Sequence, residues 1–172
     1  MVALQSTRED QLIAYLAALA IVIHIAESVL PSPLPGIKPG LANIVTVAVM
    51  CRYGWRMAAW VSALRVLVGS LLLGTFLAPT FFMSFAGALA AITLLGIGRL
   101  LPGIGPVGFS VLASLGHMAA QFAVAYTLFI PHPALFNLLP VLMTAALLFG
   151  IFNGIIAASM LAHVDSGLRR AA

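Results

Sequence analysis

The chain has 172 residues, of which 7% are charged and 63% are hydrophobic, and its mean hydropathy is +1.16. A soluble domain carries about 25% charged residues, so this composition excludes a water-soluble fold and a disordered chain. At about 20 apolar residues per membrane-spanning helix, the length suits about six helices and leaves no room for a soluble catalytic domain. We therefore predict an all-α integral membrane protein with a single transmembrane domain over residues 1–172.

Six apolar runs follow one another along the chain, and each run predicts a helix. Segments rich in proline or glycine separate several of the runs, and such residues end helices. The densest of these segments, Pro31–Gly40, contains four prolines and two glycines and predicts an irregular loop. The predicted helices cover residues 11–30, 41–53, 54–76, 80–101, 107–130 and 136–163.

The second predicted helix, over residues 41–53, is unusually short. At a rise of 1.5 Å per residue it spans about 20 Å, whereas the hydrocarbon core of a membrane is about 30 Å thick. Either this helix is a half-span, or the preceding loop enters the membrane to meet it. Irregular backbone at that depth is tolerated only beside protein or a watery cavity. The short helix therefore predicts a cavity at its beginning.

The basic residues set the expected topology. With six crossings and the N-terminus inside, Lys38 lies outside and six arginines lie inside, which follows the positive-inside rule. A five-crossing alternative, with a re-entrant second helix and the N-terminus outside, gives the same six-to-one ratio. Charge alone therefore leaves both topologies open. The six arginines are Arg8, Arg52, Arg56, Arg99, Arg169 and Arg170.

Polar side chains within membrane helices are costly and mark functional sites. Counting depth along each helix places a polar set in one layer, in the outer half of the membrane for six crossings. We predict a substrate pocket there, in which Arg65 and Lys38 favour an anionic or electron-rich group and Arg65 can bind it in a bidentate manner. The predicted substrate-binding residues are Glu27, Lys38, Asn43, Arg65, His117 and Gln121.

A purely structural interpretation of these residues stays open. A pair of Glu27 with Arg65 or Lys38 can serve stability alone, because a buried charge needs a partner in any case. His117 and Gln121 can hydrogen-bond neighbouring helices.

The sequence lacks the usual patterns of catalysis. Its only aspartates, Asp10 and Asp165, lie alone near the two ends, so no aspartate cluster is available to hold magnesium and a diphosphate. We find no phosphate-binding loop, no Ser-His-Asp set at a shared depth and no metal-ligand spacing. A single cysteine, Cys51, excludes an internal disulfide. We expect no enzyme, no cofactor and no metal, and the scattered arginines do not form a nucleic-acid-binding stripe.

Between Glu27 and Ile44 the sequence resembles the Gx transporter family, often labelled heptaprenyl diphosphate synthase component I. The resemblance covers roughly residues 10–165. That family is similar to the S components of energy-coupling factor transporters. The resemblance thus implies six helices in the bacterial inner membrane, both termini in the cytoplasm, and a vitamin-like ligand taken from outside. It also implies a transmembrane T component and ATPases as partners, docked at Ala14 and Ala18. Without the resemblance, these two small residues equally suit internal packing.

These observations lead to one leading hypothesis and two alternatives. The leading hypothesis is the substrate-binding subunit of an energy-coupling factor-like importer for a small vitamin-like or cofactor-precursor molecule. The first alternative is a non-catalytic membrane subunit of polyprenyl diphosphate synthesis. The second is an autonomous proton-coupled secondary transporter that uses Glu27 or His117. The lipid bilayer is a partner in all three.

Overall fold

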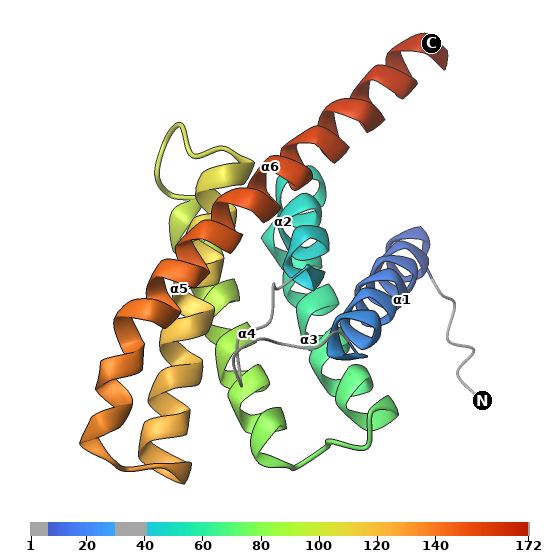
Figure 1. Cartoon of the computed structure of the whole chain (residues 1–172). Coiled ribbons are helices and arrows are strands. Elements are labelled where there is room, and N and C mark those ends of the chain that lie inside the picture. Colours follow the sequence, from blue (N-terminus) through green and yellow to red (C-terminus); the bar gives the residue numbers. More distant parts are fainter. Residues whose placement is uncertain (1–6, 30–40, 172) are drawn as a thin grey trace, which may run out of the picture.

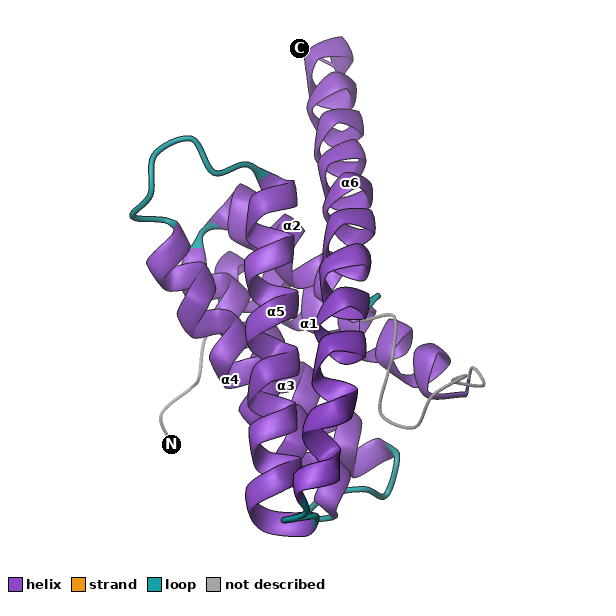
Figure 2. Cartoon of the chain, turned by 60° about the vertical axis from the view of Figure 1, so that its left-hand side comes forward, coloured by secondary structure: helices purple, strands orange, loops and turns teal. Residues whose placement is uncertain are grey.

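The structure is a computed structural model that describes residues 7–29 and 41–171. Within these residues the chain forms α-helices and no β-strand, as predicted (Figures 1 and 2). The helices pack side by side as a bundle. They are α1 (Arg8–Val29), α2 (Ala42–Tyr53), α3 (Trp55–Leu72), α4 (Pro79–Gly98), α5 (Pro106–Val124) and α6 (Leu139–Ala171).

Five apolar stretches of the described chain are long enough to cross a membrane. Each contains one of the longer helices, and α2, with 12 residues, is the short one. The chain is therefore a multi-pass membrane protein of the helical class. The five stretches are Arg8–Ser28, Trp55–Leu72, Pro79–Gly98, Pro106–Phe129 and Pro133–Ser166.

Several helix ends differ from the predicted ones. The third helix stops at Leu72 rather than at residue 76, because Gly74 and Leu77 both have positive φ in the turn that follows. After α5 the chain continues as one π-helical stretch, Ala125–Phe129, before the prolines intervene. The last helix continues past residue 163 to Ala171, so that its C-terminal part projects from the bundle (Figure 1).

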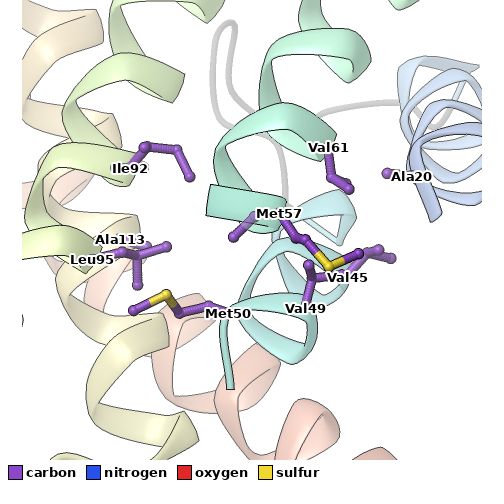
Figure 3. Packing of buried hydrophobic residues seen from close by; sticks show 11 residues of the cluster. Ala20, Val45, Val49, Met50, Met57, Val61, Ile92, Leu95 and Ala113 are labelled. Carbon is purple, nitrogen blue, oxygen red and sulfur yellow. The ribbon is translucent and has the colours of Figure 1, made fainter. Parts of the chain in front are cut away.

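The short helix α2 lies at the centre of the bundle and contacts α1, α3, α5 and α6. Its residues from Ala42 to Val47 are all buried. Most of them are apolar, as expected of a helix buried on all sides, and Asn43 and Thr46 are the polar exceptions. Figure 3 shows Val45 and Val49 of α2 among the side chains of the main apolar cluster, with Met57 from α3 and residues of three other helices. The core therefore forms around α2.

Two glycines let α6 approach α5 closely. A Cβ atom placed on Gly154 would lie 2.6 Å from Cα of Val107, and one placed on Gly150 would lie 3.0 Å from Cα of Val111. Backbone atoms cannot move aside as a flexible side chain can. The spacing Gly-x-x-x-Gly therefore serves helix packing, which is its usual role in membranes.

Replacing Gly154 with alanine is expected to lower the free energy of unfolding by about 1–3 kcal/mol, because the added methyl group overpacks the α5–α6 contact. Titration of the protein with SDS in mixed micelles measures this loss. Gly105→Ala is the matched control, because a Cβ there meets nothing within 4 Å and the backbone is extended. Equal stabilities of the two variants would contradict the packing role of Gly154.

Candidate functional site

A cavity of about 140 Å³ lies at the N-terminal end of α2. Side chains from all six α-helices line it, so the bundle as a whole shapes the site. The lining residues come from the C-terminal ends of α1 and α5 and from the N-terminal ends of α2, α4 and α6. Because neighbouring helices run in opposite directions, these ends lie at one level of the bundle. This is the layer that depth counting along the sequence predicts.

The structure brings five of the six predicted substrate-binding residues to this cavity. They lie on α1, α2, α3 and α5, and two of them are separated by 94 positions in the sequence numbering, from 27 to 121. The sixth residue, Lys38, lies outside the described residues. That these side chains bind a ligand stays a prediction. The five are Glu27, Asn43, Arg65, His117 and Gln121.

Arg65 and Glu27 are both buried, with exposed fractions of 5% and 4%. Arg65 Nη1 donates a hydrogen bond to Asn43 Oδ1 over 3.0 Å. The backbone N–H of Leu41 donates to Glu27 Oε1 over 3.2 Å. Leu41 directly precedes α2, so Glu27 satisfies one of the backbone donors that every helix leaves unpaired at its N-terminus.

The two buried charges do not form a direct ion pair. Among the described residues, the ion pair within 4.0 Å joins Arg52 Nη1 to Asp165 Oδ1 over 3.2 Å, and it connects the C-terminal end of α2 to α6. Among the described residues, no ion pair within 4.0 Å joins Glu27 to Arg65. The structural interpretation of these two charges stays a prediction. The alternative pair of Glu27 with Lys38 falls outside the described residues.

Two histidine rings are seated against glycines of neighbouring helices. A Cβ atom on Gly87 of α4 would lie 2.7 Å from the His117 ring, and one on Gly69 of α3 would lie 3.2 Å from the His24 ring. Both rings line the cavity. A larger residue at position 87 would displace His117. Sequence reasoning missed these glycines, because neither belongs to a recognisable small-residue pattern.

Apolar and hydroxyl side chains complete the wall. Met83, Met118 and Phe149 contribute apolar surface from α4, α5 and α6, and none of them was predicted. A second cavity of about 290 Å³ adjoins the first and shares His24, Val66, Thr80 and Ser84 with it. It continues toward the turn between α3 and α4. Its hydroxyl groups come from Ser28, Ser70, Thr75, Thr80 and Ser84.

The predicted docking residues lie elsewhere. Ala14 and Ala18 are exposed on α1, one helical turn apart, and neither lines the cavity. Their role in partner docking stays a prediction.

The sequence pattern of the family described as heptaprenyl diphosphate synthase component I matches residues 16–160. The chain belongs to this family. The match spans every helix of the bundle in whole or in part and confirms the resemblance found between Glu27 and Ile44. No curated protein and no solved structure matches the chain. Membership of the component I family, together with the helical membrane architecture, identifies a membrane accessory or transporter-like protein.

The described residues of this family member offer no group of three His, Cys, Asp or Glu side chains that could hold a metal ion. The polar groups of the cavity are instead one guanidinium, one carboxylate, two imidazoles, two amides and several hydroxyls. Such a set can bind and orient a small polar molecule through hydrogen bonds and charge.

Proposed function

We propose that this protein is the substrate-binding membrane subunit of an energy-coupling factor-like importer. Its substrate is a small vitamin-like or cofactor-precursor molecule that binds in the cavity at the N-terminal end of α2. The observation that carries this proposal is the burial of Arg65 in the wall of this cavity. A buried guanidinium is costly to maintain, and among the described residues Arg65 makes one hydrogen bond, to a neutral amide, so a bound polar ligand can supply further interactions.

The proposed orientation places the cavity in the outer half of the bacterial inner membrane and both termini in the cytoplasm. Arg52, Arg56 and Arg99 then lie on the cytoplasmic side, in agreement with the positive-inside rule. A substrate reaches the cavity from outside. The Arg52–Asp165 ion pair then joins α2 to α6 near the cytoplasmic surface.

Uphill transport needs an energy source, and the sequence contains no phosphate-binding loop. The proposed partners are therefore a transmembrane T component and ATPase subunits. Exposed Ala14 and Ala18 on α1 offer a surface on which a partner helix can approach closely, because small residues allow tight helix contacts. The chain itself performs no catalysis in this proposal.

The family description favours a second candidate function. As a non-catalytic membrane subunit of polyprenyl diphosphate synthesis, the protein would assemble with a soluble synthase and perform no transport.

Mass spectrometry of the purified protein and uptake measurements separate these functions. We expect a small molecule to co-purify with the full chain, and we expect its uptake into proteoliposomes only when the T component, the ATPases and ATP are present. Uptake by the isolated chain with a proton gradient alone would instead establish a secondary transporter. Co-purification with a soluble aspartate-rich synthase, without a bound small molecule, would establish the accessory subunit.

A further inference from the structure

Arg65 has binding capacity that the described residues do not use. A guanidinium carries five N–H donors in a rigid fork, and among the described residues Arg65 makes one hydrogen bond, to the neutral amide of Asn43. The side chain is 95% buried and lines the cavity. A buried guanidinium with further N–H donors available favours a ligand group that is negatively charged and accepts several hydrogen bonds.

The N-terminal end of α2 adds to this preference. The helix begins at Ala42, and Asn43 in its first turn lines the cavity. The N-terminal end of a helix carries a partial positive charge, and half-helices within membranes use it to bind anionic substrate groups. Arg65 and this helix end are joined by the hydrogen bond to Asn43. Together they form one positive wall of the cavity.

The other titratable groups at the cavity limit the charge of the ligand. Among the residues that the structure describes, these are Glu27, His24 and His117. Among the described groups, the single guanidinium carries one positive charge and the helix end adds a partial one, while the carboxylate of Glu27 carries one negative charge, so little positive charge is available to balance a ligand. A phosphate monoester carries about 1.5 to 2 negative charges at pH 7 and would leave uncompensated charge beside Glu27. A carboxylate carries one charge, and its two coplanar oxygens match the guanidinium fork.

The apolar part of the cavity lining limits the size and polarity of the rest of the ligand. Met83, Met118 and Phe149 belong to this part of the lining. The volume of about 140 Å³ is close to that of cavities of about 150 Å³ that accommodate a benzene molecule. The space beside Arg65 therefore suits an acid whose body begins with a single ring or a short apolar chain.

From this arrangement we infer that the substrate is a monocarboxylic acid. Its carboxylate binds Arg65 through two parallel hydrogen bonds beside the N-terminal end of α2, and its body packs against Met83, Met118 and Phe149. This inference rests on the proposed function, since it names the substrate class of the same cavity. A larger ligand would extend into the adjoining cavity of about 290 Å³ and contact its hydroxyl groups.

Binding of matched acid and amide pairs to the full chain in phosphatidylcholine nanodiscs tests the inference. The probes are benzoate with benzamide, 3-phenylpropionate with 3-phenylpropionamide, and phenyl phosphate. We expect at least one acid to bind at least tenfold more tightly than its amide and than phenyl phosphate. Arg65→Lys keeps the charge but removes the fork, so it should reduce acid binding at least tenfold and leave the amide unchanged. Arg56→Lys, on the exposed cytoplasmic end of α3, should have no effect.

Several outcomes would overturn the inference: equal binding of acid and amide, preference for phenyl phosphate, no binding of either acid, or unchanged acid binding by Arg65→Lys. These outcomes are distinguishable from failure of the proposed function. If a neutral or cationic compound co-purifies and is transported with ATP, the substrate class is wrong and the importer stands. If acids bind through Arg65 but the chain assembles with a synthase and transports nothing, the importer is wrong and the carboxylate site stands.

Discussion

Arg65→Gln is expected to weaken ligand capture at least 100-fold while the helical bundle still forms. A hydrogen bond to a charged group contributes about 1.5–3 kcal/mol, and the proposed ligand accepts two of them from Arg65. Loss of both amounts to about 3 kcal/mol or more, and every 1.4 kcal/mol corresponds to a factor of ten in affinity. Glutamine also removes the buried positive charge and retains an uncharged amide donor at position 65.

Two measurements check this expectation. Mass spectrometry gives the amount of small molecule that co-purifies per mole of protein, and calorimetry gives the affinity for benzoate. Arg56→Gln is the matched control, since Arg56 lies on the same helix but is exposed at its cytoplasmic end in the proposed orientation. Equal capture by the Arg65 and Arg56 variants would show that the buried guanidinium has a structural role only.

Glu27→Ala is expected to lower the free energy of unfolding by about 3–5 kcal/mol, the typical cost of removing one charge from a buried, mutually compensating set. The substitution leaves the N–H of Leu41 without its carboxylate acceptor. It also leaves Arg65, 95% buried, without the negative charge that lines the same cavity. Both effects act on the beginning of α2, which is the centre of the bundle.

A second substitution tests the electrostatic part of this explanation. Arg65→Met in the Glu27→Ala background removes the uncompensated cation, so the double variant should regain at least 1 kcal/mol over Glu27→Ala. SDS titration in mixed micelles measures all four proteins of the cycle. Glu9→Ala, on the exposed beginning of α1, is the control for loss of a glutamate. Strict additivity of the two buried substitutions would contradict an electrostatic coupling between them.

The depth of each polar residue could be predicted from the sequence, because a helix rises by a fixed amount per residue. Apolar runs give the helices, and counting along them places Glu27, Arg65, His117 and Gln121 at one level. The short second helix and the cavity at its beginning follow from the same arithmetic. The structure places these four residues and Asn43 around one cavity.

The rotation of each helix about its axis could not be predicted in the same way. In a membrane both the lipid and the protein core are apolar, so hydropathy does not distinguish the face that points inward. Met83 and Phe149 look like any other apolar residue of α4 and α6, although they line the cavity. Gly87 was missed for the same reason. Its lack of a side chain makes room for the ring of His117, which lies on another helix.

The Arg52–Asp165 ion pair was also not predicted. Three helices, α3, α4 and α5, lie between its partners in the sequence, and only the packing of α6 against α2 brings them together. The projection of α6 beyond the bundle escaped prediction because its last turns, after His163, are polar and resemble an irregular tail.

The shortness of α2 has an electrical consequence. Twelve helical residues span about 18 Å, whereas the insulating layer of a membrane is about 30 Å thick. The cavity lies at the N-terminal end of α2, and polar groups line it. The thickness that insulates one side of the membrane from the other is therefore smaller along α2 than through the surrounding lipid, and the voltage across the membrane falls more steeply there. An anion seated beside Arg65 lies at the edge of this steep region, so its entry and exit become sensitive to the membrane potential.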